Sequence, residues 1–341
     1  MSDTHTLIHS EIDYERDGVQ QGFLRLPYSV HRSAYGWIPV PIVMFKNGTG
    51  PTALIMSGNH GDEYEGQVAL TKLCQSLAVA DAADIQGRLI ILPMANYPAS
   101  QAGLRTSPFD EGNLNRSFPG DPAGTPTQMI AHYIEEILLP LCDYFFDLHS
   151  GGSSLRYPAT VVRKRGDTPE QEAALEALQI SFDAPFGFIF GGGSGGGDPR
   201  VSSAAARRKG VLGLSTELGG SGTVTPAVLA LAERGVRRLL HHIGMLPGHE
   251  PDATRGMRRM ELTGPDYFVY ARDEGLFEPY VDLLAEVKKG EPAGAIHHPE
   301  TPWEAPTICH FEHDGLVICE RIPARVQRGD CLFHLATDIQ V

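Results

Sequence analysis

Cysteine is scarce in this chain of 341 residues: it has 5 cysteines, an odd number, and no CxxC pair. A secreted disulfide framework needs paired cysteines, so we expect reduced, mostly buried thiols and a cytoplasmic location. No apolar run approaches the roughly 18–20 residues that span a bilayer. Residues 1–5 also lack the basic start that precedes the apolar stretch of a signal peptide. These absences predict a soluble protein with no membrane partner.

Basic residues are also fewer than acidic ones. The 28 Lys and Arg residues stand against 42 Asp and Glu residues, which gives a formal net charge of −14. Nucleic acids and anionic membranes are bound by clustered positive charge. We therefore expect no nucleic-acid partner, and the acidic balance is compatible with a small cationic substrate.

Glycine and proline are plentiful, with 38 and 25 residues, but most of the glycines separate apolar runs. This distribution is typical of an α/β enzyme rich in loops rather than of a low-complexity chain. Only residues 191–197 are strongly biased toward glycine. That segment is either a lid that closes over a ligand or a flexible surface loop.

Buried strands and helices alternate along the first 250 residues. The first 45 or so residues are rich in β-formers, and short apolar strands follow at 52–56, 88–92, 143–148 and 211–216. Amphipathic helices are expected over 66–77, 127–139, 169–179 and 227–243. This order predicts an α/β fold, in which ligands bind beyond the carboxyl ends of the strands.

The chain changes character after Pro247, and from about residue 257 it shows short strands and no long helix. We therefore expect a catalytic domain over 1–250 and an all-β domain over 251–341. The β segment contains a short repeat, VKKGE at 287–291 and VQRGD at 326–330. Two such units resemble the barrel-sandwich of biotinyl and lipoyl carrier domains. A carrier needs a lysine on its hairpin tip, and because none follows Lys289, we expect a non-carrier domain.

A candidate metal site begins in the motif Gly58-Asn59-His60-Gly61-Asp62-Glu63, directly after the strand at 52–56. His60 and Glu63 can converge there, and the alternative is a turn that caps the following helix. His149 ends another strand and can meet them at the same sheet edge. A catalytic Zn²⁺ takes three protein ligands plus water, so we predict one zinc ion per chain. Asp147 either accepts a hydrogen bond from a ligand imidazole or is an ordinary polar strand residue.

A zinc hydrolase needs a base, and Glu217 is a single acid between an apolar strand and a Gly-Gly turn. Its alternative role is to cap a helix or form an ion pair. Asn115 and Arg116 are suited to holding a substrate carboxylate. Arg105 is suited to stabilising an oxyanion, although each arginine alone is equally compatible with an ordinary surface role.

Taken together, Gly58–Glu63, Asn115-Arg116, Asp147–Ser150 and Thr216–Leu218 resemble the succinylglutamate desuccinylase/aspartoacylase family, relatives of zinc carboxypeptidases. The resemblance covers roughly residues 30–245. It implies a mixed sheet with helices on both faces, a small C-terminal β domain, and hydrolysis of N-acyl amino acids. It also implies the same roles for the three metal ligands, the base and the carboxylate-binding pair. Arg105 lies farther before Arg116 than the family pattern suggests.

The sequence of 103–108 and 112–120 is most similar to the family's deacetylases of N-acetyl-diaminobutyrate in ectoine breakdown. The free amine of such a substrate would need an acid, for which Asp110, Glu111 and Asp198 are candidates. Aspartoacylase or desuccinylase activity is the alternative, because it could use the basic residues Arg156, Arg163, Lys164 and Arg165. A peptide carboxypeptidase and a non-catalytic metal-binding scaffold remain as further alternatives. We also expect a homodimer, by analogy with chains of this type.

Overall fold

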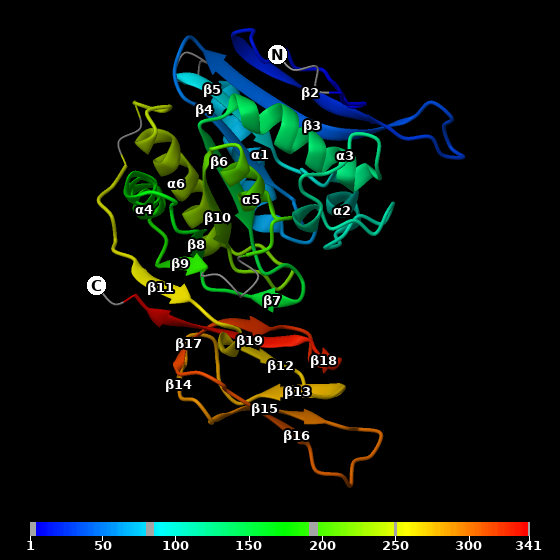
Figure 1. Cartoon of the computed structure of the whole chain (residues 1–341), viewed down its shortest axis with the longest axis vertical. Coiled ribbons are helices and arrows are strands. Elements are labelled where there is room, and N and C mark those ends of the chain that lie inside the picture. The colour runs from blue at the N-terminus through cyan, green and yellow to red at the C-terminus, as the bar shows by residue number, and fades with distance from the viewer. Residues whose placement is uncertain (1–4, 80–84, 191–196, 249–250, 340–341) are drawn as a thin grey trace.

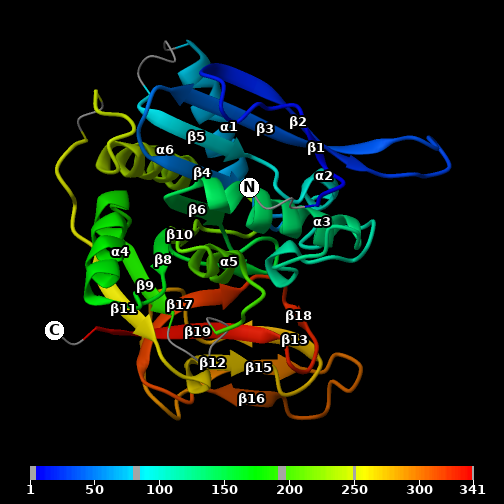
Figure 2. The same cartoon turned by 45° about the horizontal axis from the view of Figure 1, so that its top comes forward.

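The computed structural model describes residues 5–79, 85–190, 197–248 and 251–339. Within these residues the strands form a 15-stranded sheet and a 4-stranded sheet (Figures 1 and 2). The large sheet has the order β1-β2-β3-β5-β4-β6-β10-β8-β9-β11-β19-β17-β14, and β12 and β7 pair with strands at its C-terminal end. Residues 191–196 lie outside the described residues, so the structure does not test the prediction of a lid there.

Strands outnumber α-helices along the described chain. The strands up to residue 217 are β1 (His9–Ser10), β2 (Gly18–Pro27), β3 (Trp37–Asn47), β4 (Thr52–Ser57), β5 (Gly87–Leu92), β6 (Tyr144–His149), β7 (Leu155–Arg156), β8 (Thr160–Arg163), β9 (Phe186–Phe190) and β10 (Leu212–Glu217). The later strands are β11 (Arg258–Leu262), β12 (Phe268–Tyr270), β13 (Gly275–Pro279), β14 (Glu286–Val287), β15 (Pro292–His297), β16 (Thr307–His310), β17 (Gly315–Arg321), β18 (Arg325–Val326) and β19 (Cys331–Asp338). The α-helices are α1 (Tyr64–Val79), α2 (Tyr97–Ala102), α3 (Pro126–Tyr133), α4 (Pro169–Phe182), α5 (Ser202–Arg208) and α6 (Pro226–His242).

The centre of the large sheet is parallel. β5, β4, β6 and β10 lie side by side in that order, all in one direction. β4 is buried at every position, as expected for a continuously apolar strand with both faces covered. The long hairpin β2–β3 adds antiparallel strands beside β5, and β8 pairs antiparallel with β10. The sheet is therefore mixed.

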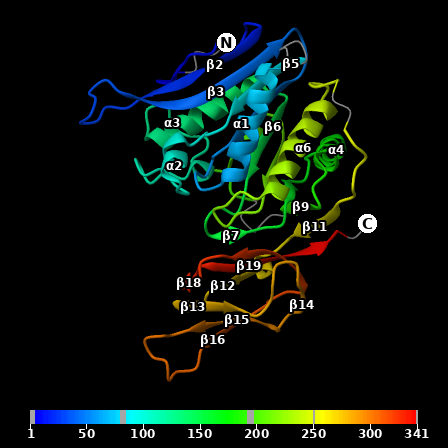
Figure 3. The ribbon, with the colours of Figure 1, turned by 180° about the vertical axis from the view of Figure 1, so that it is seen from behind.

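Helices cover both faces of this sheet. Alternate residues of β4 enter two separate cores, with Leu54 and Met56 on one face and Ala53 and Ile55 on the other. The first core includes residues of α3 and α5, and the second includes residues of α1, α4 and α6. α3 and α5 lie toward the viewer in Figure 1, whereas α1 does so in Figure 3. The predicted α/β architecture is confirmed.

Three of the longer helices begin at a Thr-Pro pair, which explains where they start. Pro126, Pro169 and Pro226 are the first helical residues, where the missing N–H costs nothing. The preceding threonines cap the helices; Thr168, for example, accepts a hydrogen bond from the Gln171 backbone N–H. The helix predicted over 127–139 is α-helical only to Tyr133 and then widens into a π-turn.

The C-terminal strands continue the large sheet and add a second one. β11 lies parallel to β9 and antiparallel to β19, so the sheet extends without a break into the last strand. β16, β15, β13 and β18 form the separate antiparallel sheet, and a third core joins the two. The predicted small β unit is therefore present beside the α/β sheet, while its division from the rest at residue 250 stays a prediction.

The five-residue repeat forms the same turn twice. The Lys288 N–H donates to the Glu291 carboxylate at 3.0 Å, and the Gln327 N–H donates to the Asp330 carboxylate at 2.9 Å. Gly290 and Gly329 have positive φ values of 89° and 93°, which explains why glycine precedes the acid in both copies. The repeat is thus a structural one, in which the acid closes a glycine turn after a short strand.

Candidate active site

Three neighbouring strands bring the predicted site residues to one edge of the sheet. β4 leads into the 58–63 loop, β6 ends at His149, and β10 ends at Glu217. Because β4, β6 and β10 are parallel, their carboxyl ends meet at this edge. Glu217 lies directly opposite His149 in the β10–β6 ladder.

Two glycines shape the loop that carries His60 and Glu63. Gly58 has a φ of 65°, a left-handed conformation that side-chain-bearing residues rarely adopt. A Cβ on Gly61 would lie 2.0 Å from the carbonyl carbon of Ala99, so the loop packs against α2 at van der Waals contact. Glu63 is the last residue before α1 begins at Tyr64. The loop therefore turns sharply, packs against α2 and leads directly into α1.

The side chains of His60, Glu63 and His149 surround one point. Each offers one ligand atom, and these atoms all lie within 4.8 Å of one another. His60 Nδ1 lies 2.7 Å from Glu63 Oε1, and His149 Nδ1 lies 2.9 Å from Glu63 Oε2. Their exposed fractions are 3, 3 and 7 % in chain order. The structure thus brings together the three residues that the sequence predicted as ligands.

The outer nitrogens of the two imidazoles show which atoms face the centre. His60 Nε2 lies 3.2 Å from Asn113 Oδ1, and His149 Nε2 lies 2.9 Å from Asp147 Oδ2. An amide oxygen and a carboxylate oxygen accept hydrogen bonds, so both Nε2 atoms donate. Each Nδ1 then faces a Glu63 oxygen, and either a proton or a metal cation between the two atoms satisfies this arrangement. Two imidazole nitrogens and a carboxylate are ligands suited to Zn²⁺.

The electrostatics of the cluster also favour a cation. Burial raises the pKa of Glu63, but His60 and His149 outweigh burial and hold that pKa far below its usual range. Burial lowers the pKa of His149, whereas the Asp147 and Glu63 carboxylates raise it well above its usual value. Burial lowers the pKa of His60. An ionised Glu63 between two imidazoles is the state that binds a metal.

Glu217 has the environment expected of a proton acceptor. Its Oε2 is buried without a hydrogen-bond partner among the described residues. Burial, followed by the negative charge of Glu63, raises the pKa of Glu217 well above its usual value. Helix capping and ion pairing, the two alternative roles, are both absent for Glu217 within the described part of the chain.

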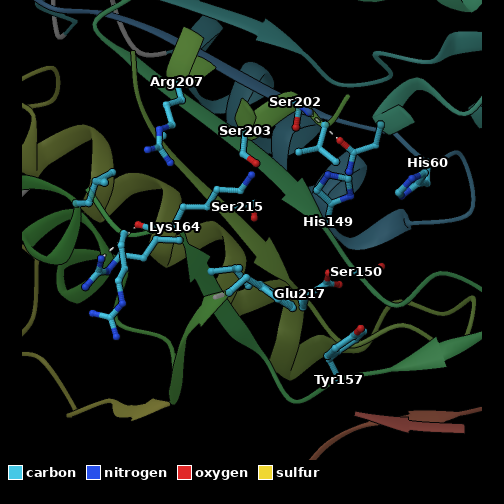
Figure 4. A pocket seen from close by; sticks show the side chains of 18 of the residues that line it. His60, His149, Ser150, Tyr157, Lys164, Ser202, Ser203, Arg207, Ser215 and Glu217 are labelled. Carbon is cyan, nitrogen blue, oxygen red and sulfur yellow. Dashed lines mark hydrogen bonds between the residues drawn. The ribbon is translucent and has the colours of Figure 1, made fainter. Parts of the chain in front are cut away.

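A cavity of about 440 Å³ extends from the cluster along the sheet. Figure 4 shows His60 and His149 at one side and Lys164 at the other, with Glu217 and Ser215 between them. Ser215 and Glu217 share a face of β10 because they are two residues apart.

The predicted substrate-binding residues also line the cavity. Asn115 Oδ1 accepts a hydrogen bond from the Ser202 N–H at 2.9 Å, which leaves the Asn115 Nδ2 hydrogens for a ligand. Arg116 Nε lies 3.5 Å from Asp198, and Arg105 Nη1 lies 3.6 Å from Glu63 Oε1. Arg105 is therefore near the cluster, as an oxyanion-stabilising residue must be.

The three acids considered for a substrate amine do not line the cavity. Asp110 accepts hydrogen bonds from the backbone and hydroxyl of Thr127 at the start of α3. Asp198 forms a two-pronged ion pair with Arg200. Glu111 is an exposed loop residue with a φ of 55°. Asp110 is thus occupied by the start of α3, and Asp198 by Arg200 and Arg116.

Several residues that contact the site residues or line the cavity were not predicted from the sequence. Asn59 and Asn113 belong to the glycine-rich motifs, but nothing in those motifs distinguishes them as partners of Asp147 and His60. Tyr157 lines the cavity beside Glu217 and carries no sequence signal. Its hydroxyl lies 3.1 Å from Nδ1 of His334 in β19, so the last strand helps to hold this cavity wall.

Comparison with known proteins places the chain in a class of enzymes. Residues 49–243 match the succinylglutamate desuccinylase/aspartoacylase catalytic domain. The chain belongs to this family, and the resemblance predicted from the motifs is confirmed. Its members are amidohydrolases of N-acyl amino acids.

Individual relatives are similar over nearly the whole chain. The N-alpha-acetyl-L-2,4-diaminobutyric acid deacetylase of Halomonas elongata is 40% identical over 334 residues, which are 98% of this chain and 96% of that protein. The product-bound structure of the ectoine utilization protein EutE (DoeB) from Ruegeria pomeroyi is 39% identical, with a TM-score of 0.90 over 98% of this chain and 99% of that one. A succinylglutamate desuccinylase/aspartoacylase structure from Rhodobacter sphaeroides is 37% identical, with the same TM-score and coverages.

Proposed function

We propose that this protein is a zinc-dependent deacetylase that hydrolyses N-acetyl-L-2,4-diaminobutyrate to acetate and the diamino acid. The observation that carries the proposal is that the candidate metal ligands and the candidate base lie close together. The His60, Glu63 and His149 ligand atoms lie within 4.8 Å of one another. Glu217, whose Oε2 has no hydrogen-bond partner in the described part of the chain, lies opposite His149 on the neighbouring strand. The activity for which the Halomonas elongata relative is named supports the choice of substrate.

His60, Glu63 and His149 would hold one zinc ion per chain. Bound zinc lowers the pKa of a water molecule and polarises a carbonyl oxygen, which are the two effects that amide hydrolysis needs. Asn113 and Asp147 would hold the imidazoles in the orientation that keeps both Nδ1 atoms toward the ion.

Glu217 would transfer the proton. Its raised pKa makes it a stronger base than an ordinary glutamate. Its Oε2, which no described residue hydrogen-bonds, can accept the proton of the attacking water. The protonated carboxyl would then donate to the nitrogen of the breaking amide bond. Because Glu217 lies opposite His149 in the β10–β6 ladder, the backbone of the sheet keeps the base beside the zinc ligand.

Asn115, Arg116 and Arg105 would bind the negative charges of the reaction. Asn115 and Arg116 follow one another on a tight turn and line the cavity, where they can hold the substrate carboxylate. Arg105, beside Glu63, would stabilise the negative oxygen that forms as water adds to the acetyl carbonyl.

A second candidate is hydrolysis of a substrate with an additional carboxylate, as in aspartoacylase or succinylglutamate desuccinylase activity. Lys164 favours it. This lysine lines the cavity, and no ion pair holds it among the described residues, whereas Arg156, Arg163 and Arg165 pair with glutamates. Figure 4 shows the Lys164 amine directed toward Ser203 and Ser215.

Location and assembly are part of the proposal. None of the described helices is long and apolar enough to cross a membrane. The five cysteines are free; Cys309 and Cys319 are buried, and the other three are half-buried. Both observations are compatible with the cytoplasm, which we propose as the location. The homodimer stays a prediction, which light scattering of the purified protein can check.

The experiment that tests the function is metal analysis followed by a substrate panel. We expect close to one zinc per chain and the highest kcat/KM on N-acetyl-diaminobutyrate among N-acetyl, N-succinyl and dipeptide compounds. A higher kcat/KM on N-acetylaspartate or N-succinylglutamate would select the second candidate. A highest rate on dipeptides would select a carboxypeptidase. Zinc without hydrolysis of any compound would leave only a metal-binding scaffold.

A further inference from the structure

Ser202 contacts two separate parts of the candidate active site. It is the first residue of α5 and is 3 % exposed. Its hydroxyl donates to Asp147 Oδ2 at 2.6 Å, and its backbone N–H donates to Asn115 Oδ1 at 2.9 Å. Asp147 is the partner of a zinc-ligand imidazole, and Asn115 is a candidate for binding the substrate carboxylate. One residue therefore contacts both.

The contact with Asp147 restricts the orientation of His149. Asp147 Oδ2 accepts from Asn59 Nδ2 at 2.9 Å, from His149 Nε2 at 2.9 Å and from the Ser202 hydroxyl. The other oxygen, Oδ1, is buried and has no partner among the described residues. Three donors on one oxygen select a single rotation of the carboxylate. Without the Ser202 hydroxyl, Oδ1 can compete for the donors, and the His149 ring loses its fixed direction.

The contact with Asn115 selects one orientation of its side-chain amide. An N–H donor must face the amide oxygen, so the Asn115 Nδ2 hydrogens point away from Ser202. Asn115 itself lines the cavity. The Ser202 N–H therefore leaves the Nδ2 hydrogens of Asn115 free to donate, and a substrate carboxylate needs hydrogen-bond donors.

The Ser202 hydroxyl has no role in capping its own helix. The N-cap residue of α5 is Val201, and no side chain caps this helix end. A serine at the start of a helix commonly bonds to a free backbone N–H nearby. In α5 the hydroxyl points across to β6 instead, so the contact serves Asp147 rather than the helix.

We propose that Ser202 is a positioning residue, whose hydroxyl orients the zinc ligand His149 through Asp147 and whose N–H orients Asn115 toward the substrate. This proposal rests on the proposed function. The two contacts come from different atoms of one residue, so they can be removed one at a time. Their losses then have different consequences, on zinc affinity in one case and on KM in the other.

Ser202→Ala removes only the hydroxyl. We expect zinc affinity, measured by competition with a chelator, to fall roughly tenfold, the lower end of the range for partners of metal ligands. The KM for N-acetyl-diaminobutyrate at saturating zinc should stay within about twofold, because the N–H remains. Ser203→Ala is the matched control for zinc affinity, since it removes a neighbouring hydroxyl that makes no hydrogen bond among the described residues. Ser202→Thr keeps both donors and should restore zinc affinity.

Ser202→Pro also removes the N–H. Val201 has φ −88° and ψ 156°, which suits a residue before proline, and the first helical position tolerates proline. We expect the KM to rise roughly fivefold above that of Ser202→Ala, as for the loss of one hydrogen bond. Asn115→Ala should raise the KM to a similar degree, and combining it with Ser202→Pro should add little.

Wild-type zinc affinity in Ser202→Ala, with an unchanged melting temperature, would overturn the proposal. So would weak zinc binding in Ser202→Thr or Ser203→Ala equal to that in Ser202→Ala, because the loss would then not depend on the Ser202 hydroxyl. An equal KM in Ser202→Pro and Ser202→Ala would overturn the part that concerns Asn115. Failure of the wild-type protein to bind zinc or hydrolyse the substrate would instead contradict the proposed function.

Discussion

Glu217 and His149 are cross-strand neighbours in the parallel ladder between β10 and β6. Adjacent strands lie about 4.8 Å apart, so the backbone hydrogen bonds of the sheet set the spacing between the candidate base and a candidate metal ligand. Both residues therefore lie at the same edge of the sheet, but their side chains have different surroundings. His149 directs a nitrogen to Glu63, whereas Glu217 keeps a carboxylate oxygen without a partner among the described residues.

Substituting each of these neighbours should therefore have a different effect. Glu217→Gln and Glu217→Ala should retain zinc and reduce kcat by about 10²–10⁴, the usual contribution of a general base. His149→Ala should lose both zinc and activity. Zinc content by atomic emission and kcat on N-acetyl-diaminobutyrate check both variants. A Glu217→Gln variant with near-normal turnover would show that the base is elsewhere.

Gly61→Ala should disrupt the metal loop. The added methyl would lie 2.0 Å from the Ala99 carbonyl carbon, so either the loop or α2 must move. We expect a lower melting temperature and weaker zinc binding, measured by calorimetry and chelator competition. Gly248→Ala is the control, because a Cβ there meets nothing within 4 Å and no left-handed φ is required. Equal behaviour of the two variants would contradict the packing explanation.

His334 should make stability depend on pH. Burial lowers the pKa of His334 to about 3, against about 6.5 in an unfolded chain. The unfolded state therefore binds more protons between these values, so stability is complete above about pH 6.5 and is lost as the pH falls toward 3. At pH 5 the loss should be about 1–2 kcal/mol. In His334→Gln, the difference between urea unfolding at pH 7.5 and at pH 5.0 should shrink by this amount; an unchanged difference would exclude His334 as its source.

Lys164→Gln should separate the two candidate substrates. If the substrate carries a cationic side chain, removing the Lys164 charge should leave kcat/KM for N-acetyl-diaminobutyrate unchanged or higher. For N-acetylaspartate the same substitution should lower kcat/KM several-fold, because a charged hydrogen bond to the second carboxylate is lost. Lys209→Gln is the matched control, since Lys209 does not line the cavity and pairs with Glu136 at 2.7 Å. A loss of activity on N-acetyl-diaminobutyrate alone would contradict this account.

The sequence predicts that His60, Glu63 and His149 meet, and the reason is local. Each of His60, Glu63 and His149 lies in a glycine-flanked motif at the end of an apolar strand, and parallel strands place such ends at one edge. The inference needs only that β4 and β6 are parallel neighbours; the order of the other strands does not affect it.

The rest of the site depends on contacts between distant segments. Ser202 is 55 residues from Asp147, and Tyr157 is 177 residues from His334. Serine and tyrosine occur too widely for a motif to mark them. The continuation of the sheet through β11 into β19 is equally hidden, because these short strands carry no signal for which partner they join.

We propose that a zinc ion held by His60, Glu63 and His149 drives hydrolysis of N-acetyl-diaminobutyrate. Titration of the metal-free protein with zinc, with acetate release followed at each step, tests it most directly. We expect no acetate release without metal, and a linear rise in the rate of release that ends at one zinc per chain. Full activity in the metal-free protein, or no acetate release at any zinc level, would contradict it.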